Sequence, residues 1–597
     1  MTCLGGEWNA KPCDYGCIPN EKECAECKEN TAVCENNTLK SCQNGKWNSQ
    51  TCNNGCNSSG NGCADCKDNS VVCENNTLKI CQNGKWNLQT CDFGCNGNSC
   101  SECKENAVVC ENNTLKTCKN GKWNSKTCEN GCNSASNACE TVNNNQPTRY
   151  IMTNRLLSPI TPYVLQSMKD IAKKNSSRTT NIVMKVGDSH YDYDFDGCFM
   201  KCFSNANTNA VTLDSHTNLQ KAINEFQKTK DSFMRDSKSA LGGKSTRDMF
   251  NSSICGSTDC ITQEINAMNP RFAFFGHGTN DMGNGCYSHA VIPNECDSYA
   301  SSLQAYYRNL NHAMDILIKN GVIPLISAIA PRNDTPDKVS YMSGASNIAS
   351  TSDYPTHMVS TFNAVARGNA EARQIPFFDT FQAFYPLPSH GIRNDKMHGS
   401  TSGSPCNFTA SGLQYGVNTR NLYSMEMLNN AWNAYTSGNA PDKVIEPFKG
   451  SGTAADPYII TSLPFTHSAN TKTTGKNVIS TYSGCAAGVD EYGPEVYYKL
   501  ELNSTKRIRT FVVSERRTYT YPYDDADLDI HILRNGAKAD NCIKRDDIMI
   551  HGSLTKGTYY FVIDTYGNAS GESVNRGKYL FGIVECDSDD KYCDKAL

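Results

Sequence analysis

The sequence predicts a multidomain protein: an α/β domain with a parallel sheet, preceded by small disulfide-rich repeats and followed by an antiparallel β-sandwich. Three patterns predict this order. Of the 33 cysteines, 22 lie before residue 140, strand-like and helix-like segments alternate through the middle, and short alternating strands fill the end. A chain of 597 residues exceeds the usual size of one core. We place the domains at residues 1–140, 150–437 and 455–590.

Charge, hydropathy and cysteine content limit the possible partners and the location. The formal net charge is −4 without a basic stripe, which disfavours a nucleic-acid partner. The longest apolar run, from Val322 to Ala330, is too short to span a bilayer. Dense cysteines predict an oxidising environment, so we expect an extracellular or cell-surface protein. Because the first residues lack a signal sequence, we expect the export signal to have been removed, or lost with a truncated start.

The first 140 residues repeat a unit with six cysteines. Full units begin at Cys27, Cys66 and Cys103, and a partial unit opens the chain. A unit of fewer than 40 residues buries too little apolar surface to fold unaided. Its even number of cysteines predicts internal disulfides, with the connectivity open. Zinc is the alternative, because pairs such as Cys63 and Cys66 have ligand spacing, but these pairs straddle unit boundaries and no histidine precedes His190.

We interpret the array as a stalk or spacer that attaches the protein to a cell surface or to extracellular matrix. One tryptophan recurs at the same offset in each unit. A single large core residue of a tiny domain is its commoner role, and a platform for a ligand is the alternative. These tryptophans are Trp8, Trp47, Trp86 and Trp123.

Helical and strand patterns alternate in the middle region. This alternation predicts a parallel sheet covered by helices on both faces, with ligands bound at the carboxyl ends of the strands. We expect helices at residues 163–174, 219–228, 301–319, 357–373 and 413–434, and strands at 181–186, 271–275, 322–329 and 376–379.

Three short motifs in this region contain the residues of an acyl-transfer site. Gly187-Asp188-Ser189-His190 and Gly278-Thr279-Asn280-Asp281 each follow an expected strand, and Asp395-Lys396-Met397-His398 lies near the end of the domain. Each motif alone is a weak signal, and a polar turn would explain it. Together they supply a hydroxyl, an imidazole that titrates near neutral pH, a carboxylate to orient it and an amide donor.

The order of these motifs resembles the SGNH (GDSL-type) hydrolases, which include esterases and lipases. The resemblance covers residues 150–437 and implies a flavodoxin-like α/β/α three-layer fold. It further implies that Ser189 is the nucleophile, that His398 is its general base and that Asp395 orients His398.

The same resemblance implies an oxyanion hole formed by three donors. These are the backbone N–H of Ser189, the backbone N–H of Gly243 and the side-chain amide of Asn280. Gly243 lies in a Gly-Gly segment similar to the family's Gly-x-Thr/Ser segment, and Gly242 is the alternative.

His190 departs from the family pattern, which has leucine at this position. We expect a tolerated polar residue at the rim of the cleft, with a group that supports the catalytic residues, or a substrate contact, as the alternatives. His190 is also a rival base, but extended backbone would point it away from Ser189, so we prefer His398. We expect structural or loop roles for five further histidines of the domain, which are His216, His277, His289, His357 and His390.

Two loops and two cysteine pairs complete the predictions for this domain. The Tyr/Asp-rich segment 191–196 and the long loop 333–355 are candidates for sugar contacts, with a metal-binding loop less favoured. The short spacings of Cys255 with Cys260 and of Cys286 with Cys296 suggest disulfides.

The last region has the short alternating strands of an antiparallel sandwich, expected at residues 495–502, 509–514, 528–534 and 558–564. Its motifs, including Asp527-Leu528-Asp529-Ile530, resemble bacterial pre-peptidase C-terminal (PPC) domains, which are accessory modules of secreted enzymes. Four aspartates could bind calcium, although solvated turn carboxylates are the commoner case. They are Asp524, Asp525, Asp527 and Asp529, and the expected disulfides join Cys485 to Cys542 and Cys586 to Cys593.

Taken together, the sequence predicts an exported serine esterase that hydrolyses acetyl or similar esters, with acylated polysaccharide as the expected substrate. No cofactor is expected for the reaction. Two alternatives stay open: a catalytically idle surface protein that binds carbohydrate, and an O-acyltransferase.

Overall fold

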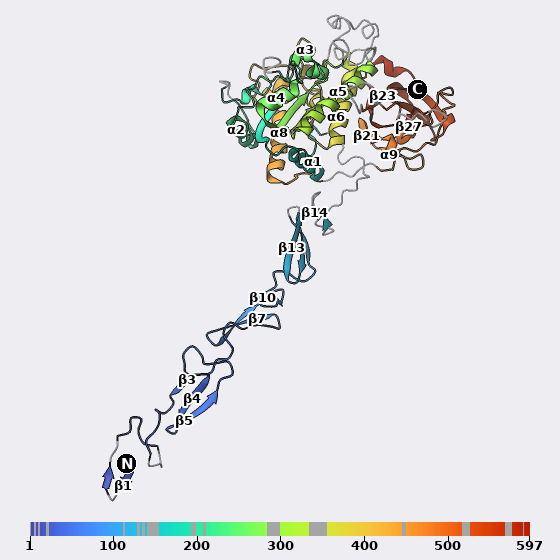
Figure 1. The fold of residues 1–597 in the computed structure, drawn as a ribbon. Coiled ribbons are helices and arrows are strands. Elements are labelled where there is room, and N and C mark those ends of the chain that lie inside the picture. Colours follow the sequence, from blue (N-terminus) through green and yellow to red (C-terminus); the bar gives the residue numbers. More distant parts are fainter. Residues whose placement is uncertain are drawn as a thin grey trace. The chain divides into compact units, whose positions relative to one another are not determined.

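The computed structural model describes residues 2–4, 7–9, 12–18, 23–111, 114–127, 132–133, 138–139, 155–192, 199–206, 211–282, 299–332, 355–443, 449–515, 526–567, 576–588 and 590–597. The chain forms two compact units, Met1–Val142 and Asn143–Leu597, which are treated separately below (Figure 1). No helix among these described ranges has the length and apolar character needed to cross a membrane.

Each full repeat of the first unit is a three-stranded antiparallel sheet. In the first of them the Asn44-Gly45 turn has positive φ at both residues, as a tight hairpin requires. The carboxylate of Glu29 accepts hydrogen bonds from both backbone N–H groups of this turn. The strands are β3 (Ala32–Glu35), β4 (Thr38–Gln43) and β5 (Lys46–Thr51); β6 (Val71–Glu74), β7 (Thr77–Gln82) and β8 (Lys85–Thr90); and β11 (Val108–Glu111), β12 (Thr114–Lys119) and β13 (Lys122–Thr127).

Short two-stranded sheets complete the described part of the array. They are formed by β1 (Thr2–Leu4) with β2 (Glu7–Asn9), β9 (Cys95–Asn96) with β10 (Ser99–Cys100), and β14 (Cys132–Asn133) with β15 (Ala138–Cys139).

Disulfides join the cysteines of the first two full repeats in the order first to third, second to fifth and fourth to sixth, and the third repeat has the bond from first to third, Cys103–Cys118. In the first full repeat these bonds are Cys27–Cys42, Cys34–Cys56 and Cys52–Cys63, and the second repeat has the same pattern. The closely spaced Cys63 and Cys66 belong to different repeats and different disulfides. The predicted disulfides are therefore confirmed in the full repeats, and in the partial unit Cys13 pairs with Cys24 while Cys17 is free among the described cysteines. The described cysteines of the full repeats are not arranged as zinc ligands.

The second unit contains a parallel four-stranded sheet in the order β16-β17-β18-β19. The strands are β16 (Thr179–Gly187), β17 (Pro270–Gly276), β18 (Ile323–Ser327) and β19 (Phe377–Phe378). An isolated parallel bridge from Gly187 to Ala240 extends the sheet beyond β16 at the end that precedes Ser189. Strands β17 and β18 are buried throughout, which explains their continuous apolar sequences. The α/β domain with a parallel sheet is confirmed.

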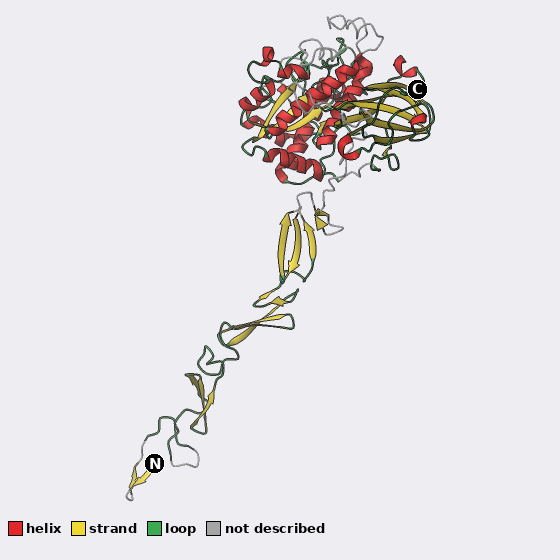
Figure 2. Ribbon diagram, turned by 45° about the vertical axis from the view of Figure 1, so that its right-hand side comes forward, coloured by secondary structure: helices red, strands yellow, loops and turns green. Residues whose placement is uncertain are grey.

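The helices around this sheet fall into two groups by their contacts, and Figure 2 shows helices surrounding the strands. One group contains α1 (Pro162–Lys173), α2 (Gln220–Lys228) and α8 (Gly416–Ser437), and the other contains α4 (Cys260–Met268), α5 (Tyr299–Lys319) and α6 (Pro355–Arg373). Of these, α4 was not predicted. The short helices α3 (Ser252–Cys255) and α7 (Thr380–Phe384) were not predicted either.

The predicted disulfide Cys255–Cys260 is present, and a second one, Cys202–Cys406, joins distant parts of the domain. The predicted pair Cys286 and Cys296 lies outside the described residues, as does Cys198.

Two sheets form the C-terminal sandwich, in the orders β20-β22-β27-β24-β25 and β21-β28-β23-β26. Every pair is antiparallel except β20 with β22, so the prediction of a fully antiparallel sandwich is wrong at this edge, where the incoming chain runs parallel to β22. The predicted disulfides Cys485–Cys542 and Cys586–Cys593 are present. The elements are β20 (Tyr458–Ile460), β21 (Phe465–Asn470), α9 (Thr471–Thr474), β22 (Val496–Leu502), β23 (Lys506–Ser514), β24 (Leu528–Arg534), β25 (Cys542–Asp546), β26 (Met549–Leu554), β27 (Gly557–Thr565) and β28 (Lys578–Glu585).

The sandwich packs on the α/β domain through a continuous apolar core. Helix α6 contacts β21 and β28, and Leu580 of β28 belongs to the same buried cluster as the sheet of the α/β domain. Gly368 of α6 makes this contact possible, because a Cβ there would lie 2.4 Å from Leu580 Cδ1. A fully buried ion pair, Arg509 with Asp590, lies at the same boundary, and Arg509 also donates to the carbonyl of His357. The two domains therefore form one compact unit.

Candidate active site

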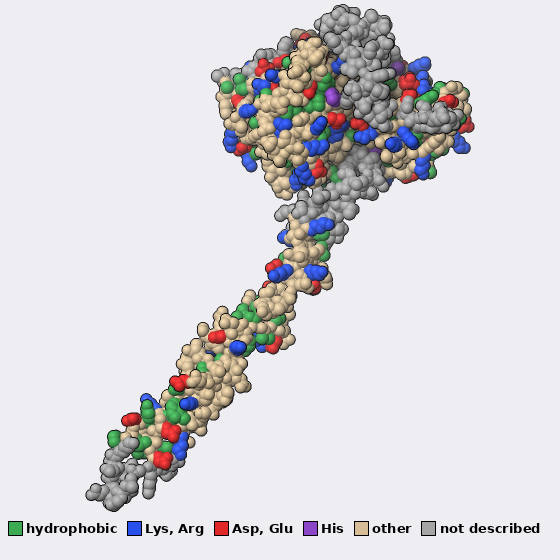
Figure 3. Space-filling model, viewed as in Figure 1, with side chains coloured by type: hydrophobic (Ala, Val, Ile, Leu, Met, Phe, Trp, Pro, Cys, Tyr) green, Lys and Arg blue, Asp and Glu red, His purple; other side chains and the backbone are tan. Residues whose placement is uncertain are grey.

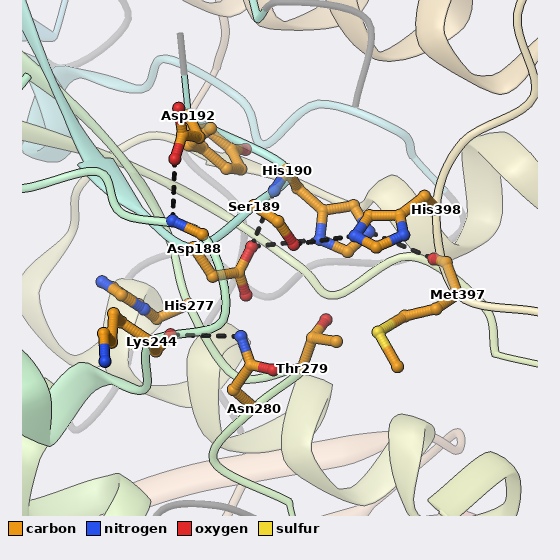
Figure 4. Close-up of polar contacts among 12 residues, drawn as sticks. Asp188, Ser189, His190, Asp192, Lys244, His277, Thr279, Asn280, Met397 and His398 are labelled. Carbon is orange, nitrogen blue, oxygen red and sulfur yellow. Dashed lines mark hydrogen bonds and ion pairs between the residues drawn. The ribbon is translucent and has the colours of Figure 1, made fainter. Parts of the chain in front are cut away.

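Ser189 and His398 meet although 209 residues separate them in the chain. Ser189 follows the end of β16, and its Oγ lies 2.8 Å from Nε2 of His398 (Figure 4). The backbone turns sharply after the strand, because the N–H groups of Tyr191 and Asp192 both donate to the carbonyl of Asp188. This turn places the serine at the carboxyl end of the parallel sheet, where the fold was expected to bind ligands.

Asp395 holds the other nitrogen of His398. Its Oδ2 lies 2.9 Å from His398 Nδ1, and its Oδ1 accepts the backbone N–H groups of Met397 and His398. Arg393 donates to the same carboxylate. Partial burial alone would raise the pKa of Asp395, but these hydrogen bonds outweigh it and hold the pKa well below its usual value. The carboxylate is therefore ionised at neutral pH.

This chain of contacts determines how a proton can move. An ionised Asp395 accepts the Nδ1–H of His398, which leaves Nε2 of the neutral ring as an acceptor facing the Ser189 hydroxyl. An imidazole in this tautomer can take the hydroxyl proton when the oxygen attacks an electrophile. The structure brings together the three residues that the sequence singled out for this purpose.

Asn280 lies beside the segment that contains the predicted Gly243. Its Nδ2 donates to the carbonyl of Lys244 at 3.2 Å, and the second hydrogen of the amide group stays available for another acceptor. The neighbouring Asp281 accepts the backbone N–H and the hydroxyl of Thr246. Burial raises the pKa of Asp281 to about 7. Asp281 therefore ties the 244–246 segment to the end of β17.

Gly242 and Gly243 differ in how they are engaged. The N–H of Gly242 donates to Asp192 Oδ2 at 2.7 Å, so this donor is already used. Gly243 has φ of 70° and an exposed position where an added Cβ would meet no atom within 4 Å. The segment is anchored to the nucleophile strand because the N–H of Leu241 donates to the carbonyl of Gly187. The backbone N–H of Gly242 is therefore already engaged, and the role of Gly243 stays a prediction.

The expectation for His190 was wrong. His190 is not at the rim of a cleft but buried, with 6% of its surface exposed. The backbone is not extended here but turns, and this turn directs the ring inward. Its Nδ1 lies 3.0 Å from Asp188 Oδ1, its Nε2 lies 3.2 Å from the carbonyl oxygen of Met397, and its ring is 5.1 Å from that of His398.

The other described histidines lie in structural contacts. His277 is buried, which lowers its pKa to about 4 and keeps it neutral. His216 lies 3.0 Å from Glu426, and His357 lies 3.5 Å from Asp587. His390 stacks on Tyr385. His289 and most of the two loops predicted to touch sugars, residues 193–196 and 333–354, lie outside the described residues.

Sequence reasoning missed the supporting role of three residues, two of which, Tyr191 and Asp192, it had placed in a loop expected to touch sugars. Arg393 donates to the carboxylate of Asp395, and Asp192 accepts the backbone N–H of Gly242. Tyr191 fills the space beside two strand-end glycines, since a Cβ on Gly276 would lie 1.9 Å from Tyr191 Cε2, and one on Gly187 would lie 2.5 Å from Tyr191 Cβ. The glycine that ends each strand was the available signal for this close packing.

The aspartates predicted to bind calcium do not form one group among the described residues. Asp524 and Asp525 lie outside those residues, and Asp527 is exposed. Asp529 points inward, where it pairs with Arg545 at 2.6 Å. Ligand atoms of three buried residues, Glu491, His531 and Asp564, lie within 4.8 Å of one another. Calcium binding stays a prediction for this domain.

No family model and no curated protein matches the sequence. The chain is similar to the structure of a GDSL-like lipase from Bacteroides thetaiotaomicron, with 12% identity, coverage of 46% of this chain and 100% of the lipase chain, and a TM-score of 0.24. It is also similar to the pre-peptidase C-terminal domain of collagenase from Bacillus anthracis, with 14% identity, coverage of 21% and 91%, and a TM-score of 0.14. The function has to be inferred from this chain's own residues.

Proposed function

We propose that this protein is a carboxylic ester hydrolase of the SGNH (GDSL) type with Ser189, His398 and Asp395 as its catalytic triad. The contact that supports the proposal most strongly is the 2.8 Å approach of Ser189 Oγ to His398 Nε2, with Asp395 on the opposite side of the ring. The two helix groups that contact the parallel sheet support a flavodoxin-like three-layer arrangement of this domain.

The proposed reaction has two halves. Ser189 Oγ adds to the ester carbonyl while His398 takes its proton, and the tetrahedral intermediate expels the alcohol, which receives that proton. Water then attacks the acyl-serine, again losing a proton to His398, and the carboxylic acid leaves as Ser189 recovers its hydrogen. The ionised Asp395 stabilises the imidazolium that exists during each half.

The negative oxygen of the tetrahedral intermediate needs fixed donors. We assign this role to the backbone N–H of Ser189, the backbone N–H of Gly243 and the side-chain amide of Asn280. The contact of Asn280 with Lys244 supports the assignment, because it fixes the amide next to the Gly243 segment. Each such donor typically contributes a factor of about 10²–10³ to kcat.

We propose acetyl or similar small esters on polysaccharide as the substrate, with an extracellular or cell-surface location. Disulfides in both units support an oxidising environment. In the face shown in Figure 3, basic and acidic side chains of described residues are interspersed, which suits a neutral ligand better than a polyanion. The repeat array would attach the enzyme to a surface or matrix, and calcium would bind only in the C-terminal sandwich.

Hydrolysis of p-nitrophenyl acetate tests the proposal. Turnover should fall by about 10⁴-fold in Ser189→Ala. It should persist in the control Ser252→Ala, which replaces an exposed serine of the same domain. The absence of Ser189-dependent turnover would contradict the esterase and favour an idle carbohydrate-binding protein.

A panel of acetylated xylan, pectin and peptidoglycan then identifies the substrate class. Adding a sugar acceptor separates hydrolysis from transfer, since an O-acyltransferase would yield acylated sugar in place of free acetate.

A further inference from the structure

We propose that His190 is a positioning residue: a buried imidazolium that ties the loop of Asp395 and His398 to the turn that carries Ser189. This inference rests on the proposed esterase function and deepens it. It assigns a role to the residue at which this chain departs from the motif it resembles.

His190 bridges two segments through its two ring nitrogens. Nδ1 lies 3.0 Å from Oδ1 of Asp188, the residue before the nucleophile. Nε2 lies 3.2 Å from the carbonyl oxygen of Met397, the residue before the proposed base. Figure 4 shows the ring between the Ser189 turn and the His398 loop.

The identity of the two partners determines the protonation of the ring. A backbone carbonyl can only accept a hydrogen bond, so Nε2 must carry a proton. Asp188 Oδ1 also accepts the backbone N–H of His190, and a carboxylate offers acceptors only. A neutral imidazole has a single N–H, so donation to both partners requires the doubly protonated, charged ring.

Burial makes this pair hard to replace. Asp188 is 2% exposed and His190 is 6% exposed, so removing one charge would leave the other buried without its counterion. Burial alone would raise the pKa of Asp188, but the charge and hydrogen bonds of His190 hold it below its usual value. Leucine could fill the space at position 190, but it could not donate to Met397.

Several titratable groups face this pair, and a pH experiment has to account for them. The ring of His398 lies 5.1 Å from that of His190 and is itself bound to Asp395, which Arg393 contacts. His277 and Asp281 interact electrostatically with Asp188 from the end of β17. The ion pair of His190 with Asp188 is neutral overall, so losing only the histidine charge would add one negative charge close to His398.

Three variants separate anchoring from charge: His190→Leu, His190→Gln and the double variant D188N/H190Q. In His190→Leu, kcat for p-nitrophenyl acetate should fall by about 10–100-fold with KM within about twofold, because the base is displaced rather than the substrate. His216→Gln is the matched control, because it removes a histidine–carboxylate pair elsewhere in the domain, and its kcat should not change.

The pH profile distinguishes positioning from a purely structural role. In His190→Gln the negative charge of the unpaired Asp188 should raise the pKa of His398. The acidic limb of the kcat/KM profile should therefore shift to higher pH by about 0.5 pH unit or more. D188N/H190Q should return the limb to its original pH while kcat stays low. If thermal unfolding shows that one variant does not fold, the other two still distinguish a positioning role from a purely structural one.

A spectroscopic readout does not depend on activity. In protein labelled with ¹⁵N-histidine, one doubly protonated ring should persist at pH 7.5 and be absent from His190→Gln. A neutral His190 ring, or variants with unchanged kcat and an unchanged pH profile, would overturn the inference. A wild-type protein without Ser189-dependent turnover would instead refute the esterase, whatever the state of the His190 ring.

Discussion

The repeat array and the second unit, Asn143–Leu597, are stabilised by different means. Nine of the twelve buried apolar residues in the described part of the array are cysteines, and Ile18, Ala64 and Leu78 are the others. The second unit buries a large set of aliphatic and aromatic side chains, and its core runs from the α/β sheet into the sandwich. The difference teaches that cross-links replace a core in the array, whereas in the second unit packing also places the groups of the proposed active site.

The largest effect should come from an active-site change that leaves both kinds of stability intact. Asn280→Ala should lower kcat by about 10²–10³-fold, because it removes a donor to the proposed oxyanion. Steady-state kinetics with p-nitrophenyl acetate measure this, and thermal unfolding should show both units folded. A kcat near that of the wild type would exclude Asn280 from the oxyanion hole.

Removing one array disulfide should break the array and spare catalysis. Replacing Cys27 and Cys42 by serine opens a loop with a separation of 15 residues. The loss should be about 3 kcal/mol, enough to unfold so small a repeat. Limited proteolysis should cut the first full repeat of this variant while esterase turnover stays at the wild-type level. A protease-resistant repeat would mean that its sheet is stable without this cross-link.

Adding an atom to the core shared by the α/β domain and the sandwich should lower the stability of the second unit alone. Gly368→Ala places a methyl group against Leu580 and should destabilise this unit by about 1–3 kcal/mol. The control Gly488→Ala adds the same atoms where no neighbour lies within 4 Å. Calorimetry should show a lower Tm for the first variant only. Equal values would indicate that the sandwich and α6 do not pack tightly.

Acid should weaken the two units differently, because the array contains no histidine. Burial lowers the pKa of His467 to about 3, so the folded protein keeps it neutral while the unfolded chain takes up a proton below about pH 6.5. Its contribution to stability is therefore present above pH 6.5 and is lost as the pH falls.

Comparing denaturation of the wild type with His467→Gln isolates this contribution. Between pH 7 and pH 5 the wild type should lose about 1–2 kcal/mol more than the variant. The same loss in both proteins would show that His467 is protonated in the folded state.

Much of the fold was predictable because its signals are local. Strands such as β16 and β17 are apolar runs that end in glycine, and each was predicted within two residues. Helix α4 was missed although Asp259 caps it, because its apolar and polar residues separate onto opposite faces less clearly than those of α2, which has the same length. The parallel pairing of β20 depends on where the incoming chain meets the sandwich, which no local pattern encodes.

The residues of the candidate site could be selected from the sequence, but the residues that hold them in place could not. Motif order sufficed to select Ser189, Asn280, Asp395 and His398 from among many polar residues. A supporting role for His190 was only an alternative, because it depends on the turn after β16 and on the carbonyl of Met397, more than 200 residues away. Hydrogen bonds to backbone leave no trace in the sequence of the acceptor.

The continuous core between α6 and β28 has a consequence for how the polypeptide can be divided. Cutting the chain between residues 438 and 457 would sever one peptide bond and leave the apolar contacts around Leu580 and the ion pair of Arg509 with Asp590 in place. The two fragments should therefore copurify as a single particle. Either fragment expressed alone would expose to solvent the apolar surface that is buried between the two domains in the intact chain.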